Sequence, residues 1–222
     1  PTTTMTPMME VCDKDIMIVV DESGSMELSN FLLALDFVKY QIENIFSLGT
    51  RIGLVTYSGE ENVVLDWSFS NTQTPRSHII NAINSLTYSD GLTATKNGIQ
   101  KGLDDINDYD DSTKDNVLLL ITGSLPNRGG SPCDLKQDLD NANVKVIIIA
   151  VGNFDPTQIT CLVDDTSSDI IQLTDFTDFN NLMLPCPPTS APTSSTSAPT
   201  SSTSAPTSST SAPTSSTSAP TS

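Results

Sequence analysis

The chain has 222 residues and a formal net charge of −17, with 27 acidic side chains against 10 basic ones. This excess of negative charge repels phosphate backbones and anionic lipid, so it argues against binding to nucleic acid or to a membrane surface. No apolar run in the sequence approaches the ~18 residues that a membrane-spanning helix needs, so we expect no insertion into a membrane.

Composition divides the chain into three parts. Residues 1–10 form a Thr/Pro-rich linker, and residues 187–222 consist almost entirely of a TSAPTSS repeat. Such a repeat cannot bury enough apolar surface to fold, so we expect a disordered, mucin-like stalk. Residues 11–186 remain, a suitable length for one domain with a complete core. Linkers on both sides indicate a module of a larger protein.

The four cysteines allow three disulfide connectivities, and none of them belongs to a CxxC pair of the kind found in structural zinc sites. Cys12 and Cys186 bracket the folded region, so we favour a Cys12–Cys186 bridge together with a Cys133–Cys161 bridge. An even number of cysteines beside a Ser/Thr/Pro-rich tail is typical of an oxidising environment. We therefore expect an extracellular or cell-surface location.

Within the domain, short apolar runs alternate with segments of helical periodicity. In chain order the pattern predicts a strand at 15–20, a helix at 28–46, strands at 51–57 and 62–69 joined as a hairpin, helices at 74–86 and 95–107, a strand at 116–122, a helix at 133–143, a strand at 144–152, a helix at 155–163, a strand at 169–173 and a helix at 174–184. Continuously apolar strands that alternate with helices predict a doubly wound, mostly parallel six-stranded α/β sheet with helices on both faces. The hairpin supplies one antiparallel edge strand.

The first predicted strand runs into the sequence DESGS, residues 21–25. In doubly wound sheets, ligands bind beyond the carboxyl ends of the strands where the strand order reverses, and the first strand normally borders that point. Asp21, Ser23 and Ser25 can turn three oxygen atoms toward one point around Gly24, and hard divalent cations prefer oxygen ligands. Two neutral hydroxyls leave the ion with surplus positive charge, which favours a carboxylate from a partner as a further ligand.

This D-x-S-x-S motif resembles the metal-ion-dependent adhesion site of von Willebrand factor A domains and integrin inserted domains. The stretches IMIVVDESGSM, SNFLLALDFV, RIGLVTYS, LTATKNGIQ, NVLLLIT and VKVIIIAVG follow in that family's order and spacing, across nearly the whole folded region. The resemblance implies a Rossmann-like α/β domain that binds Mg²⁺, Mn²⁺ or Ca²⁺. It also implies an extracellular protein partner with an exposed Asp or Glu side chain.

The metal ligands of the family can be transferred residue by residue. Asp21, Ser23 and Ser25 match the first metal-binding loop. Thr93 matches the threonine of the second loop, counted back from a helix glycine, and Thr95 is the alternative. Either threonine would otherwise serve as a helix N-cap.

The third loop departs from the family pattern. The family carries an aspartate at the end of the fourth strand, in a stretch like ITDG, whereas this chain reads ITGS with Gly123 in the aspartate's place. Loss of one carboxylate weakens a site for a hard cation. Ser124, Asp90 and Asp111 are candidate substitutes from neighbouring loops. We expect the loops around Glu22, Asp90 and Ser124 to form the rim of the site, where Glu22 would influence the choice of partner.

The sequence does not predict an enzyme. The chain has one histidine, His78, and no G-x-S-x-G motif around Ser23 or Ser25, so a serine nucleophile would lack its base. Phosphatases with an aspartate nucleophile need a second acid two residues later, where this chain has Ser23. We predict an adhesion or matrix module that binds an acidic side chain through a divalent metal. The alternative, which Gly123 favours, is a metal-independent structural or spacer module with a vestigial site.

Overall fold

The computed structural model describes residues 14–71, 74–152, 156–182 and 184. The linker at 1–10, the predicted Cys12–Cys186 bridge and the repeat at 187–222 lie outside these residues. Within the described part, no helix combines the length and the apolar character that crossing a membrane requires.

Six strands form a single sheet in the order β3-β2-β1-β4-β5-β6. They span Asp15–Asp21 (β1), Arg51–Tyr57 (β2), Val63–Trp67 (β3), Asn116–Thr122 (β4), Val144–Val151 (β5) and Ile170–Leu173 (β6). The β2–β3 pair is antiparallel, and the other neighbouring strands are parallel. The predicted doubly wound, mostly parallel sheet with one antiparallel edge strand is confirmed.

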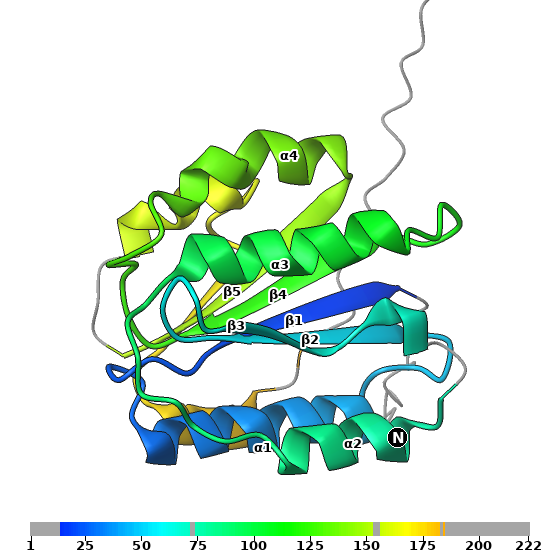
Figure 1. The fold of residues 1–222 in the computed structure, drawn as a ribbon, viewed down its shortest axis with the longest axis horizontal. Helices are drawn as coiled ribbons and strands as arrows, with labels where there is room; N and C mark the ends of the chain where they lie inside the picture. Colours follow the sequence, from blue (N-terminus) through cyan, green and yellow to red (C-terminus); the bar gives the residue numbers. More distant parts are fainter. Residues whose placement is uncertain (1–13, 72–73, 153–155, 183, 185–222) are drawn as a thin grey trace, which may run out of the picture. The chain divides into compact units, whose positions relative to one another are not determined.

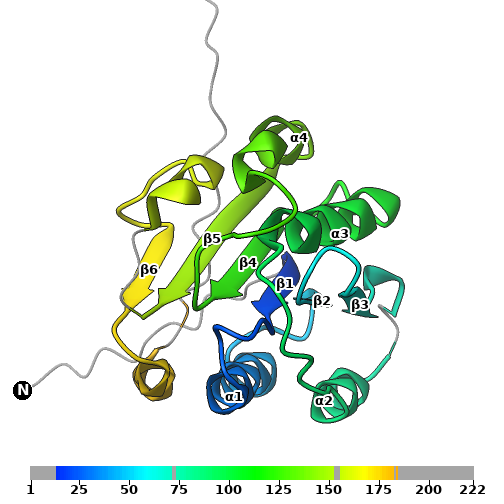
Figure 2. The same ribbon diagram turned by 60° about the vertical axis from the view of Figure 1, so that its left-hand side comes forward.

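Helices cover both faces of the sheet (Figures 1 and 2). On one face lie α1 (Leu28–Asn44), α2 (Arg76–Asn84) and the 3₁₀ helix η5 (Phe176–Asn181), and on the other lie α3 (Thr95–Asp108) and α4 (Lys136–Asn141). Further 3₁₀ helices span Phe69–Asn71 (η1), Pro132–Leu135 (η2), Pro156–Gln158 (η3) and Thr160–Leu162 (η4). Because each face is covered, alternate residues of β1 enter two different cores. This explains why the central strands are continuously apolar in the sequence.

Two of the predicted helices are shorter than expected. Among the described residues, 156–163 contain only the 3₁₀ helices η3 and η4, and 174–182 contain only η5. Thr157, Ile159 and Thr160 are β-branched and therefore poor helix formers, which is consistent with short turns in the first segment. In the second, Asp175 and Asp178 form a capping box that starts η5.

A disulfide joins Cys133 of η2 to Cys161 of η4, with the two Cα atoms 5.6 Å apart. The two residues are 28 positions apart in the sequence. On the chain-entropy account, closing a loop of this length stabilises the fold by roughly 3–4 kcal/mol. The bridge fastens the loop that follows β4 to the segment that follows β5.

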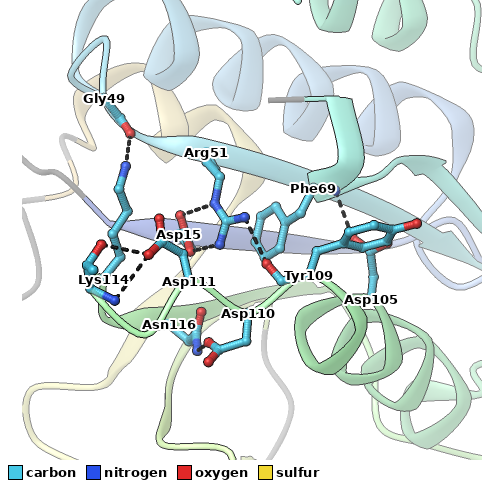
Figure 3. A network of polar contacts seen from close by, with 11 residues as sticks. Asp15, Gly49, Arg51, Phe69, Asp105, Tyr109, Asp110, Asp111, Lys114 and Asn116 are labelled. Atoms are coloured by element: carbon cyan, nitrogen blue, oxygen red, sulfur yellow. Dashed lines mark hydrogen bonds and ion pairs between the residues drawn. The ribbon is translucent and has the colours of Figure 1, made fainter. Parts of the chain in front are cut away.

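A network of polar contacts lies at the amino ends of β1, β2 and β4 (Figure 3). The carboxylate of Asp15, 0% exposed, accepts two hydrogen bonds from Arg51, of which the one from Nε is 2.7 Å long. Arg51 also donates to the carbonyl of Tyr109 at 2.8 Å and stands over the ring of Phe69, 5.1 Å from its centroid. Asp111 lies in this network, before β4 begins. It is therefore at the opposite end of the sheet from the DESGS loop, and the suggestion that it replaces a metal ligand is wrong.

Candidate metal centre

The DESGS loop lies where the strand order of the sheet reverses. β2 and β3 extend to one side of β1, whereas β4, β5 and β6 extend to the other. Asp21 is the last residue of β1 and Thr122 the last of β4, and Thr122 Oγ1 donates a hydrogen bond to Asp21 Oδ2 at 2.9 Å. Both side chains are fully buried. The carboxylate is thus fixed at the position where doubly wound sheets bind their ligands.

The backbone of the loop is held by two short contacts. The amide of Ser23 donates to Asp21 Oδ1 at 2.9 Å, and the amide of Gly24 donates to the carbonyl of Gly91 at 2.8 Å. A Cβ atom at position 24 would lie only 2.4 Å from Asp90 Oδ1, so a larger residue there would displace the Asp90 side chain. The same distance shows that the Asp90 carboxylate lies against the loop, as its candidacy for the rim requires.

Four hydroxyl groups converge beside Asp21, and we call them the hydroxyl cluster: Ser23, Ser25, Thr93 and Ser124. Ser23 Oγ lies 3.0 Å from Ser25 Oγ and 3.1 Å from Thr93 Oγ1. Ser124 Oγ lies 2.8 Å from Ser25 Oγ and 3.0 Å from Thr93 Oγ1, and Ser25 and Thr93 are 3.3 Å apart. Ser124 Oγ also donates to Asp21 Oδ2 at 3.3 Å. Three loops that are distant in the sequence therefore bring their oxygen atoms to one point.

The spacing of these oxygens suits a small divalent cation. Octahedral ligands at 2.0–2.1 Å from Mg²⁺ are separated by about 2.9 Å along each edge. The oxygens of Ser23, Ser25 and Thr93, separated by 3.0 to 3.3 Å, can form one triangular face of such a shell. All of the donors are hard oxygen atoms. Across the described residues, no group of three or more His, Cys, Asp or Glu side chains is placed to hold a metal, so hydroxyls would supply most of the ligands at this site.

Burial raises the pKa of Asp21, although hydrogen bonds from Ser23, Thr122 and Ser124 act in the opposite direction. The charged form of a carboxylate is costly in a buried site unless a positive charge lies nearby. A cation at the hydroxyl cluster would supply that charge. The oxygen ligands of the site and the raised pKa of Asp21 are therefore both consistent with a bound hard cation.

Glu22 does not lie at the rim, and this prediction was wrong. Its side chain is only 4% exposed, and Oε1 accepts hydrogen bonds from Ser89 Oγ at 2.9 Å and from Asn62 Nδ2 at 3.4 Å. The side chain lies on the α1 face because successive residues of an extended chain point to opposite sides. Burial, followed by repulsion from Asp66 and Asp21, raises the pKa of Glu22 to about 7.

Thr93, and not Thr95, belongs to the cluster. Thr95 is the first residue of α3, and its buried hydroxyl lies 3.3 Å from that of Tyr57. Neither threonine caps α3, because Ala94 occupies the N-cap position and no side-chain capping bond is formed. The amide of Thr93 donates to Asn127 Oδ1 at 3.0 Å, and this contact positions the threonine.

Position 123 faces away from the hydroxyl cluster. A Cβ atom built on Gly123 would lie 2.9 Å from Phe176 Cζ and 3.3 Å from Met26 Sδ, in the apolar core. The next residue, Ser124, carries the hydroxyl that joins the cluster. Sequence reasoning included Ser124 as a candidate but missed Thr122, although its place at the carboxyl end of a central strand is a usable signal.

Residues 15–184 match the von Willebrand factor type A domain. The mouse protein "Sushi, von Willebrand factor type A, EGF and pentraxin domain-containing protein 1" is 30% identical over 144 residues, which cover 62% of this chain and 4% of that protein. Mouse integrin alpha-M is 28% identical over 148 residues, 64% of this chain and 12% of that protein. Mouse vitrin is 33% identical over 110 residues, 49% of this chain and 16% of that protein. The match thus covers only a small part of each relative.

Among solved structures, proximal thread matrix protein 1 from the mussel byssus has a similar fold. Its crystal form 2 gives a TM-score of 0.69 at 22% identity, covering 78% of this chain and 47% of that one. A further structure of the mussel protein, described as having a zinc-occupied MIDAS motif, gives a TM-score of 0.63 at 20% identity, over 78% of this chain and 46% of that one. The family match over residues 15–184 is consistent with the observed strand order and with a site where that order reverses. The chain belongs to the von Willebrand factor type A domain family.

Proposed function

We propose that this domain is an extracellular or cell-surface adhesion or matrix module that binds a protein partner through a divalent cation at the hydroxyl cluster. The observation that carries the proposal is the convergence of four hydroxyls on the carboxylate of Asp21, with neighbouring oxygens 2.8 to 3.3 Å apart. Two of the similar proteins are, by their names, an integrin subunit and a thread matrix protein. The zinc-occupied motif of the mussel protein gives additional support.

Ser23, Ser25 and Thr93 would hold the cation with their hydroxyl oxygens, and Asp21 would contact it directly or through water. Ser124 would stand beside the ion in place of the aspartate expected one position earlier. Mg²⁺, Mn²⁺ and Ca²⁺ all accept such oxygen donors. When bound, the cation supplies a positive charge that a single carboxylate does not neutralise, and this charge attracts an acidic side chain of the partner.

Residues around the site keep its ligands in position. Thr122 and the amide of Ser23 each bind one oxygen of Asp21, so the carboxylate cannot rotate freely. Asn127 fixes the backbone of Thr93. Such supporting contacts orient metal ligands and contribute to metal affinity. We propose binding and not catalysis, because His78, the single histidine of the chain, lies exposed on α2.

A metal-independent structural or spacer role is the second candidate. The hydroxyls of the cluster satisfy one another by hydrogen bonds, so the site can fold without an ion. The absence of an aspartate at position 123 also favours this role. The two functions differ in one respect: only the metal-bridged module loses its partner when the cation is removed by chelation.

The test is a calorimetric titration of Mg²⁺, Mn²⁺ and Zn²⁺ into the metal-stripped protein. The variant Asp21→Asn removes the charge but keeps the size of the side chain, and Ser25→Ala removes one hydroxyl. Ser77→Ala, at an exposed position of α2, is the control. One-to-one binding that both site variants weaken and the control does not would support the metal-bridged module. No binding at millimolar metal would reject it in favour of the spacer.

A further inference from the structure

Most basic side chains of this acidic domain already have an ion-pair or hydrogen-bond partner. The chain has 10 of them. Those that form ion pairs or hydrogen bonds are Lys14, Lys39, Arg51, Arg76, Lys96, Lys114, Lys136 and Lys145. Within the part of the chain that the structure describes, Arg128 and Lys101 have no such partner. Two cationic groups therefore remain available for a ligand.

Arg128 lies next to the hydroxyl cluster. The amides of Asn127 and Arg128 donate to the carbonyl of Thr93 at 3.0 and 3.2 Å. Arg128, which is exposed, lines a surface pocket of about 480 Å³ together with Pro126, Asn127, Ser131, Pro132 and Gln158. The two residues whose amides hold the backbone of a proposed metal ligand therefore also line the pocket.

The loop that carries Arg128 is fixed on several sides. The amide of Gly129 donates to Glu60 Oε1 at 2.9 Å, and Gly129 has φ of 77°, a conformation that favours glycine. Cys133 at the far side of the pocket is bonded to Cys161. A pocket with a preformed backbone loses little entropy when it binds a ligand.

We infer that this pocket is a second subsite for the partner and that Arg128 binds a second carboxylate of an extended acidic segment. The inference rests on the proposed function, in which a first carboxylate of the same segment reaches the cation. A guanidinium pairs with a carboxylate through two parallel hydrogen bonds, which adds geometric selectivity to the attraction. The unpaired charge also offsets, locally, the repulsion between an acidic ligand and a chain that carries −17.

The spacing of the two carboxylates follows from the length of an extended chain, which advances about 3.3 Å per residue. Acidic residues two or three positions apart are therefore separated by roughly 7–10 Å. This is the distance that an arginine side chain can reach from a backbone adjoining Thr93. The ligand class is thus a peptide with two acidic residues at this spacing, which explains why one cation is left unpaired beside the site.

The test compares two capped peptides, acetyl-Gly-Asp-Gly-Gly-Asp-Gly-amide and the same peptide with Asn in place of the second Asp. Each is titrated into the isotope-labelled full chain with millimolar Mg²⁺ and again with a chelator, and the Nε–Hε signal of Arg128 is followed by NMR. We expect the peptide with two acids to bind about five- to tenfold more tightly, the effect of one charge-assisted contact at a partly exposed site. Arg128→Gln should abolish this difference, whereas Lys101→Gln, which removes the other unpaired charge, should preserve it.

The outcomes separate this inference from the proposed function. If the peptide with one acid binds only with Mg²⁺ but the second acid adds no affinity, the subsite is wrong and the metal bridge stands. If Arg128-dependent binding of the second acid persists without any metal dependence, the subsite stands and the metal bridge fails. Equal binding of both peptides, or no binding of either, would overturn the subsite for an acidic peptide.

Discussion

Phe176 occupies the space into which a side chain at position 123 would project, since a Cβ atom there would lie 2.9 Å from Phe176 Cζ. The ring of Phe176 cannot easily move, because it is buried and packs on Phe179, which stacks on Phe37. Gly123 is therefore a consequence of packing beneath the site, and the departure from the family's aspartate is linked to the position of η5.

Gly123→Ala should reduce the free energy of unfolding by about 1–3 kcal/mol, the usual cost of overpacking a core. The double variant Gly123→Ala/Phe176→Leu should lose less stability than the sum of the losses in the two single variants, because the smaller leucine leaves room for the Cβ atom at position 123. Urea denaturation of the four proteins measures both quantities. Additive effects would contradict the contact between the two positions.

Ser124→Asp should tighten Mg²⁺ binding by roughly tenfold, because it adds a carboxylate at a position that faces the hydroxyl cluster. Gly123→Asp should not, because its side chain would enter the apolar space beside Phe176 and Met26. Calorimetry on the metal-stripped proteins tests the pair. A stronger gain from Gly123→Asp than from Ser124→Asp would show that the loop rearranges around the ion.

Arg51→Ala should destabilise the domain by about 3–5 kcal/mol, the cost of leaving a buried charge without its partner. The partner is Asp15, 0% exposed, while the Arg51 side chain is 15% exposed (Figure 3). The control is Lys39→Ala, whose partner Asp36 is 69% exposed, and its effect should be below about 1 kcal/mol. Equal denaturation midpoints for the two variants would contradict this account.

Asp66→Asn should remove a pH-dependent loss of stability. Burial raises the pKa of Asp66 from 3.8 to about 6, and Oδ2 finds no hydrogen-bond partner among the described residues. Between these two pH values the folded state retains a proton that the unfolded state has released, so stability falls as the pH rises and the loss is complete above pH 6.

The difference in the free energy of unfolding between wild type and Asp66→Asn should therefore change by roughly 1–2 kcal/mol across that pH range. This is less than the energy equivalent of the whole pKa shift, because the side chain of Asp66 is partly exposed. Denaturation at pH 4, 5 and 7 in the presence of a chelator provides the measurement. A difference that does not vary with pH would show that Asp66 titrates normally.

Local patterns in the sequence predicted most of the fold. The strands, the order of strands and helices, and the antiparallel hairpin follow from apolar periodicity, because each buried face must be covered by the next element. The same reasoning put Asp21, Ser23 and Ser25 together, since all three lie in one short loop after a buried strand. It failed for the helix predicted at 174–184, where the described backbone forms only the short 3₁₀ helix Phe176–Asn181.

The remaining features depended on contacts between distant segments. Composition alone did not show that Glu22 turns inward to Ser89 or that Asp111 lies beside Arg51 at the other end of the sheet. Nor did the sequence decide whether position 123 or 124 faces the hydroxyl cluster. That choice depends on which side of the chain Phe176 fills, more than fifty residues later in the sequence. The sequence by itself determined the kinds of oxygen donor at the site, whereas the tertiary packing decided which of them meet.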